Sequence, residues 1–126
     1  MEQQIIYKSE VYQIVGLCME VYNTLGYGFL EIVYKDAMEI EFIERSLNYQ
    51  RENEHTIKYK GKLLNRKFIT DFTLNDTIIV EVKANKDGIT DDAIAQTLNY
   101  LKASGIRLGL IINFGKTSLE YKRLVY

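Results

Sequence analysis

The sequence predicts a single α/β (or α+β) domain with a mixed central sheet flanked by helices. Three observations favour this class. Two stretches near the N-terminus repeat apolar residues at helical spacing, the middle of the chain contains strand-like runs bounded by turn signals, and a later helical stretch separates two blocks of strands. With 126 residues, the chain has the length of one domain with its own core, so we treat residues 1–126 as one domain. The expected order is α-α-β-β-β-α-β-β.

Two helices are expected before the first strand. The first covers residues 9–25, with Ser9 as a candidate N-cap and Gly26 as a candidate stop. After a tight glycine-containing connection, the second covers residues 29–46. Its candidate buried residues are Leu30, Val33, Ala37, Ile40 and Phe42.

The rest of the chain alternates between strands and one helix. Gly61 marks the turn between the first two strands, and Thr90 and Gly105 are the candidate cap and stop of the helix. A helix between strand blocks allows one βαβ crossover in an otherwise antiparallel sheet. The strands are expected over residues 49–59, 63–74, 77–84, 106–113 and 119–126.

The hairpin formed by residues 68–74 and 78–84 brings polar residues together. Side chains alternate between faces along a strand, so each run has an apolar face and a more polar face. Burying both apolar faces together requires Leu74 to pair with Ile78 across a three-residue loop, because a slip of one residue would invert the faces of a strand. This register places Asp71 directly opposite Glu81, with Lys83 on the same side.

These three side chains predict the chemistry of a divalent-metal phosphodiesterase. Opposed carboxylates repel each other unless a cation lies between them or one binds a proton. Oxygen ligands favour Mg²⁺ or Mn²⁺, which can polarise a water for attack on phosphate, and Lys83 can orient that water or neutralise the transition state. The alternative interpretation is a solvated surface on which Lys83 pairs with an acid.

Two further segments carry candidate site residues. Glu31 lies in the first turn of the second helix. Either the helix dipole alone favours a carboxylate at this position, or the carboxylate has a function and reaches the metal or its water. Gln96 and Tyr100 are four residues apart and therefore share a helix face, which is not the apolar one. Their amide and hydroxyl groups suit a bound water or a phosphate, although such a pair is also ordinary surface.

Composition excludes several other classes of site. The single Cys18 excludes an intramolecular disulfide and a cysteine-rich zinc site, and His55 is the only histidine. The absence of a membrane-length apolar run and of a signal peptide predicts a cytoplasmic protein with no membrane partner. A net charge of −1 argues against non-specific coating of nucleic acid. Five basic residues nevertheless fall within ten positions with no acid among them: Lys58, Lys60, Lys62, Arg66 and Lys67. They predict either a face that binds phosphates or a solvated hairpin.

The motifs together resemble a known group of enzymes. Asp71, the triplet Glu81-Val82-Lys83 and the segment Gln96-Thr97-Leu98-Asn99-Tyr100 are similar to the PD-(D/E)XK nuclease superfamily, and the Gln-x-x-x-Tyr element to its RecB-type exonuclease branch. Residues 26–34, 95–103 and 109–115 resemble the small GxxExxY family within that superfamily. Two positions depart from the pattern. Tyr22 stands where the family often has histidine, and Thr70 where the superfamily has proline.

The resemblance implies a restriction-endonuclease-like core and a set of residue roles. Asp71 and Glu81 would bind the metal, with Glu31 as an additional helix-borne acid. Lys83 would be the catalytic lysine, acting with these three acids. Gln96 and Tyr100 would support substrate binding.

Three functions remain open from the sequence. The first is a Mg²⁺- or Mn²⁺-dependent deoxyribonuclease that acts on DNA. The second is a non-catalytic module on a nuclease fold that binds nucleic acid or a partner protein. The third is a structural or oligomeric scaffold with solvated acids. A chain of this size has no additional domain for substrate binding, so a homo-oligomer or a partner protein is expected as a further source of substrate contacts.

Overall fold

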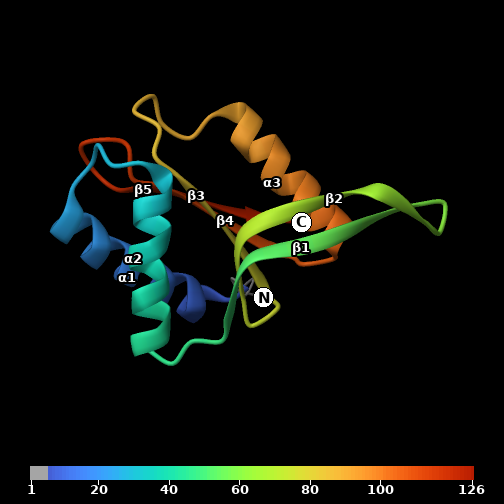
Figure 1. Ribbon diagram of the computed structural model, residues 1–126, viewed down its shortest axis with the longest axis horizontal. Helices are drawn as coiled ribbons and strands as arrows, with labels where there is room; N and C mark the ends of the chain where they lie inside the picture. Colours follow the sequence, from blue (N-terminus) through green and yellow to red (C-terminus); the bar gives the residue numbers. More distant parts are fainter. Residues whose placement is uncertain (1–5) are drawn as a thin grey trace, which may run out of the picture.

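The computed structural model describes residues 6–126 as one sheet with helices on both sides (Figure 1). The elements follow in the predicted order, and the mixed α/β class is confirmed. They are α1 (Lys8–Leu25), α2 (Glu31–Glu44), β1 (Tyr49–Tyr59), β2 (Lys62–Leu74), β3 (Ile78–Lys83), α3 (Asp91–Ser104), β4 (Leu108–Asn113) and β5 (Glu120–Val125).

The five strands lie in the sheet in the order in which they occur along the chain, β1-β2-β3-β4-β5. All neighbouring strands are antiparallel except β3 and β4, which are parallel and are connected through α3. This connection is the single βαβ crossover predicted from the sequence.

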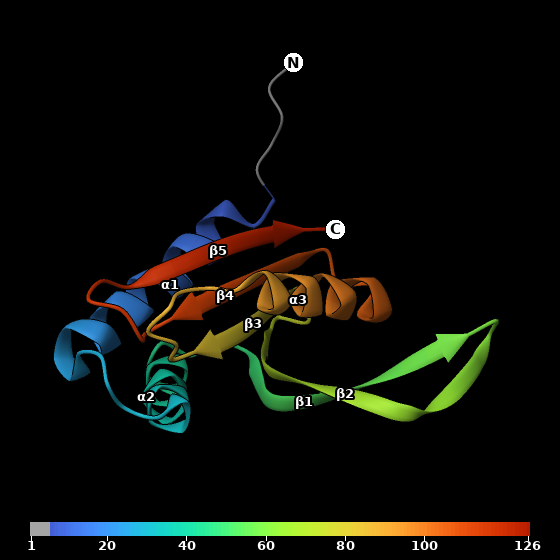
Figure 2. The same cartoon turned by 90° about the horizontal axis from the view of Figure 1, so that it is seen from above.

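Helices cover the two faces of the sheet unequally. α1 and α2 pack on one face and α3 on the other (Figure 2). The central strand β3 is therefore buried on both faces. Val80 and Val82 join the cluster under α1 and α2, while Ile79 joins the smaller cluster under α3. Glu81 follows Ile79 on the α3 side, because side chains alternate along a strand.

Both ends of α3 and the end of α1 at Gly26 agree with the prediction, while the start of α1 and both ends of α2 differ from it. The Thr90 hydroxyl accepts a hydrogen bond from the Ala93 N–H (3.1 Å), and Gly105 ends α3 with φ of 77°. α1 begins at Lys8 with Tyr7 as its N-cap, so the prediction of Ser9 as N-cap was wrong.

The predicted burial along α2 was partly wrong. Leu30 precedes the helix as its N-cap and is 76% exposed, and Ile40 is 57% exposed. Phe42 is buried as predicted, and Tyr34 and Met38 precede it at intervals of four residues, so the three face the sheet together.

The predicted hairpin register is confirmed, but the alternation along β2 changes midway. Leu74 pairs with Ile78, and the ladder between β2 and β3 ends where Phe72 pairs with Val80. Phe72 packs under α1 and α2, yet Phe68 stacks on Tyr100 of α3 with ring centroids 4.4 Å apart. The strand pair bends between these two phenylalanines.

Within residues 6–126, no helix is both long and apolar enough to span a bilayer.

Candidate active site

The carboxylates of Asp71 and Glu81 meet where the β2–β3 ladder ends. The Asp71 N–H donates to Glu81 Oε2 (2.8 Å), and the Val82 N–H donates to Asp71 Oδ2 (2.7 Å). Each strand thus offers a side-chain oxygen to a backbone N–H of the other strand, in place of ladder hydrogen bonds. The register predicted from the apolar pattern does bring these two acids together.

Glu81 has an unfavourable environment for a negative charge. Its residue is only 4% exposed. Burial, followed by the charge of Asp71, raises the pKa of Glu81 from 4.5 to about 8, although the hydrogen bond from the Asp71 backbone and the charge of Lys83 oppose the rise. A proton or a cation between the two carboxyl groups would relieve their repulsion.

Lys35 provides a positive charge at this position that the sequence reasoning missed. Its Nζ lies 3.0 Å from Asp71 Oδ1 and 3.2 Å from Glu52 Oε1, and the residue is 7% exposed. Burial lowers the pKa of Lys35, but its hydrogen bonds and ion pairs with Asp71 and Glu52 outweigh burial and raise this pKa overall. One sequence signal existed, because Lys35 follows Glu31 by four residues and must share its helix face.

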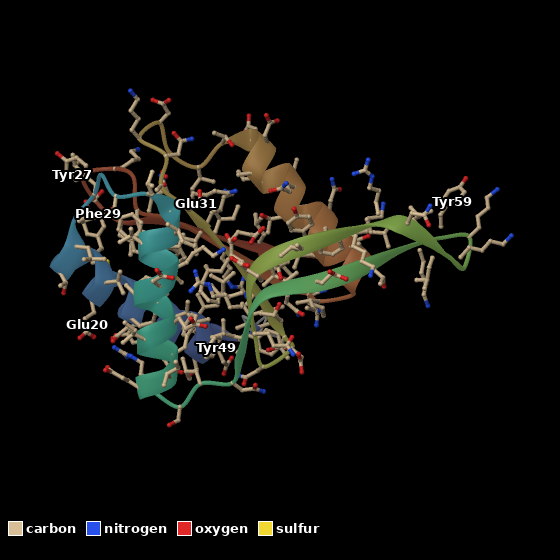
Figure 3. The ribbon with its side chains drawn as sticks, in the orientation of Figure 1. Glu20, Tyr27, Phe29, Glu31, Tyr49 and Tyr59 are labelled. Carbon is tan, nitrogen blue, oxygen red and sulfur yellow. The ribbon has the colours of Figure 1, made fainter. Side chains whose placement is uncertain are left out.

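A cavity of about 480 Å³ lies between the start of α2, the end of β3 and the first turns of α3. Three predicted residues line it, namely Glu31, Lys83 and Gln96. Asp71, Glu81 and Tyr100 do not line it. Figure 3 shows Glu31 at the end of α2 nearest α3. The other lining residues are Ala84, Asn85, Gly88, Thr90, Asp92 and Ala93.

The loop before α2 holds Glu31 in position through a buried tyrosine. The Tyr34 hydroxyl donates to the Gly26 carbonyl (2.6 Å) and accepts from the Phe29 N–H (3.2 Å), and its ring stacks on Phe114 with centroids 4.4 Å apart. Gly26 and Gly28 adopt φ of 70° and 107°, which favour glycine. The segment therefore turns sharply and presents Glu31 in the first turn of α2.

The pKa of Glu31 is affected by other charged residues of the site. Burial raises the pKa of Glu31, the Lys83 ammonium lowers it, and the Asp71 carboxylate raises it further. These couplings place Glu31 within electrostatic reach of both the lysine and the acid pair.

Tyr100 of α3 lies within electrostatic reach of the acid pair. Burial raises the pKa of Tyr100 first, and the charges of Glu81 and Asp71 raise it further. Its ring belongs to a continuous stack in which Phe68 lies between Tyr100 and His55, with centroids 4.4 Å and 4.7 Å apart. Gln96 lines the cavity together with Lys83, while the Tyr100 ring lies on Phe68, which the alternation rule placed on the apolar face of the hairpin.

The chain after Lys83 is fixed by Asn113, another residue that sequence reasoning missed. Its side-chain oxygen accepts from the Asn85 N–H (2.8 Å) and the Gly115 N–H (3.1 Å), and its Nδ2 donates to the Asn85 carbonyl (2.9 Å). Asn113 is fully buried at the end of β4. A polar residue ending an apolar strand was the available signal.

The residues present suit a hard divalent cation. Among residues 6–126, no three histidine, cysteine or acidic side chains converge into a preformed metal cluster. Mg²⁺, however, usually binds one or two carboxylates and keeps several waters, and the Asp71–Glu81 pair offers that donor set. Lys35 and the Val82 N–H each contact one Asp71 oxygen, so an incoming cation would share those oxygens with them.

Comparisons with known proteins place this geometry in context. Residues 8–124 match a family model described as the PD-(D/E)XK nuclease superfamily. Among solved structures, the chain is similar to one titled "Crystal structure of SSO0001", with a TM-score of 0.59 and 17% sequence identity. That alignment covers 94% of this chain and 60% of the other, so the chain spans less than two thirds of the length of that structure. No curated protein matches the chain.

Proposed function

Since the chain belongs to the PD-(D/E)XK nuclease superfamily, we propose that it is a divalent-metal-dependent nuclease that hydrolyses phosphodiester bonds in DNA. One observation carries the proposal. The carboxylates of Asp71 and Glu81 meet at the end of the β2–β3 ladder, two residues before Lys83, which lines a cavity together with Glu31. The segment from Gly26 to Tyr34 supports the narrower assignment to the GxxExxY family.

The proposed roles follow from where each side chain lies. Asp71, Glu81 and Glu31 would hold Mg²⁺ or Mn²⁺. When bound, the ion supplies a polarised water and neutralises charge on the attacked phosphate. Lys83 lines the cavity and would orient the nucleophile or stabilise the developing charge on phosphate oxygens.

Gln96 and Tyr100 would contact the substrate from α3. The Gln96 amide lines the cavity and offers both a donor and an acceptor to a phosphate or to water. The Tyr100 hydroxyl would donate a hydrogen bond while remaining protonated, since its pKa is raised by burial and by the nearby acids.

The direct test is cleavage of DNA. Purified protein is incubated with linear, nicked and single-stranded DNA in the presence of Mn²⁺ or Mg²⁺. Activity is expected from the wild type and not from Lys83→Ala, whereas Lys86→Ala removes an exposed lysine nearby and serves as the matched control. Cleavage no greater than that of Lys83→Ala on every substrate would reject the proposal.

One observation favours a second candidate, a non-catalytic module that binds nucleic acid or a partner. The Lys35 ammonium is placed where a cation would otherwise balance Asp71, so the acid pair is partly neutralised without metal. This candidate predicts that DNA is bound in a salt-dependent manner without turnover, and that Mn²⁺ leaves the melting temperature unchanged.

A further inference from the structure

The β1–β2 hairpin extends beyond the body of the protein. We call residues 58–67 the β1–β2 arm. Every residue of the arm is exposed, and none belongs to either core cluster. Figures 1 and 2 show the arm reaching away from all three helices, with Tyr59 labelled near its far end in Figure 3. Both faces of this ribbon are therefore available to a partner.

The core of the protein does not require this extension. Fixing the backbone costs about 1–2 kcal/mol per residue, and a two-stranded ribbon with no covered face recovers little of that cost by burial. The strands below the arm already pair and pack under the helices, and they include all residues proposed for the active site on this hairpin. The arm thus offers surface for contact outside the chain.

The charge of the arm identifies the kind of partner. The arm carries five basic residues and no acidic one, whereas the whole chain has a net charge of −1, so the rest of the molecule carries −6. Lys67 pairs with Glu54 at 2.9 Å. For the other four cations, no carboxylate within residues 6–126 lies at ion-pair distance. Such a separated positive ribbon on a negative body suits a polyanion.

The arm is continuous with the candidate active site. Arg66 lies two residues before Phe68 on β2, and Lys62 lies four residues further toward the tip, past the shift in the β1–β2 register between Thr56 and Lys58. Phe68 stacks on Tyr100, whose hydroxyl is affected by the charges of Glu81 and Asp71. At about 3.3 Å per residue, Arg66 is roughly 17 Å along β2 from Asp71. A strand of phosphates lying along the arm would lead toward the acids.

We propose that the β1–β2 arm binds double-stranded DNA, with Lys62 and Arg66 contacting the phosphates that lead toward the acid pair. A two-stranded β-ribbon matches the width of the major groove, which is about 12 Å. The inference rests on the proposed nuclease function and specifies its substrate as a duplex held by the arm. Phosphate contacts supply affinity and register without reading the base sequence.

The experiment measures binding separately from cleavage. Fluorescence anisotropy of a labelled duplex is recorded over a range of salt concentrations in a metal chelator, for wild type, the double variant Lys62→Ala/Arg66→Ala, and Lys8→Ala/Lys122→Ala. The last pair removes the same charge from exposed positions on α1 and β5. Lys62→Arg/Arg66→Lys tests rescue by retained charge.

The expected result is a change in salt dependence. Each lost phosphate contact lowers the slope of log affinity against log salt by about 0.9, so the arm variant loses about 1.8. The affinity ratio between wild type and arm variant then falls by about 12-fold between about 50 mM and about 200 mM salt. The control pair and the charge-retaining pair should keep the wild-type slope.

Other outcomes separate the two proposals. Equal slopes for the arm variant and the Lys8→Ala/Lys122→Ala control would overturn the arm proposal, even if the wild type cleaves DNA. Duplex binding that depends on the arm, without cleavage under any metal condition, would reject the proposed nuclease function and support the proposed role of the arm in DNA binding. A dimer that the arm variant abolishes, with no duplex binding by wild type, would show that the arm contacts a second copy and would overturn the inference.

Discussion

Replacing Glu81 with glutamine tests whether a buried charge beside Asp71 controls the stability of this fold. Burial and the Asp71 charge raise the pKa of Glu81 from 4.5 to about 8. Glutamine keeps the shape of the side chain and an oxygen that can accept the Asp71 N–H, but it carries no charge at any pH. The substitution therefore removes the titration and leaves the packing in place.

The direction of the pH effect follows from the raised pKa. The folded protein binds more protons than the unfolded chain between about pH 4.5 and about pH 8, so its free energy of unfolding falls as the pH rises. The contribution is complete below about pH 4.5 and is lost as the pH rises through about 8. The gap between these pKa values corresponds to about 5 kcal/mol, at about 1.4 kcal/mol per pKa unit. That is a large part of the ~5–15 kcal/mol that stabilises a typical domain.

The assay is urea unfolding followed by circular dichroism, in a metal chelator, at several pH values from about 4.5 to 9. Glu81→Gln should have nearly wild-type stability at the acidic end and exceed it by several kcal/mol at the alkaline end. The exposed Glu44, at the end of α2, provides Glu44→Gln as the control that should follow the wild-type curve.

Divalent metal should reduce the stability difference between Glu81→Gln and the wild type at alkaline pH. If Glu81 binds the ion, Mn²⁺ stabilises the wild type by about 2.7 kcal/mol at 100 times its dissociation constant, and Glu81→Gln by less. A difference in the free energy of unfolding between the two proteins that is constant across all pH values would refute the reasoning. It would show that the Glu81 carboxyl has the same pKa in the folded and unfolded states.

Three further substitutions, and Gly16→Ala as a control for one of them, test by urea unfolding which contacts support the site. Lys35→Met should destabilise the fold by about 1–3 kcal/mol by removing the buried ammonium from the partly buried Asp71, and equal stability would show that the ion pair contributes nothing. Gly115→Ala should cost about 1–3 kcal/mol, since its Cβ would lie 2.4 Å from the Asn85 nitrogen. Gly16→Ala, with open space around it in α1, should be neutral or stabilising, and equal losses would reject the steric explanation. Thr90→Ala should cost about 1 kcal/mol through the lost cap of α3, and no change would show that the cap is dispensable.

Features set by neighbouring residues could be predicted from the sequence. Thr90 and Gly105 gave the ends of α3 because a cap hydrogen bond and a left-handed glycine depend on local geometry. The register of Leu74 with Ile78 could be predicted because only one alignment buries both apolar faces. From that register followed the meeting of Asp71 with its partner acid.

Features set by tertiary contacts could not be predicted in this way. The alternation rule placed Phe68 and Phe72 on one face, but Phe68 stacks on α3 while Phe72 packs under α1 and α2. The bend lies near Glu52, which adopts φ of 52° across from Asp71 and is one partner of Lys35. The spacing of Lys35 from Glu31 indicates only a shared helix face, so the burial of Lys35 against Asp71 required knowledge of how α2 docks.

The agreement between strand order and chain order has a consequence for folding. Neighbouring strands close short loops, which costs little entropy, and only the pairing of β3 with β4 must wait for residues 84–107. During synthesis, β3 therefore keeps one unpaired edge until α3 and β4 leave the ribosome. Apolar edges of this kind are prone to pair with other chains. The strand that carries Glu81 is thus open to mispairing before the domain is complete.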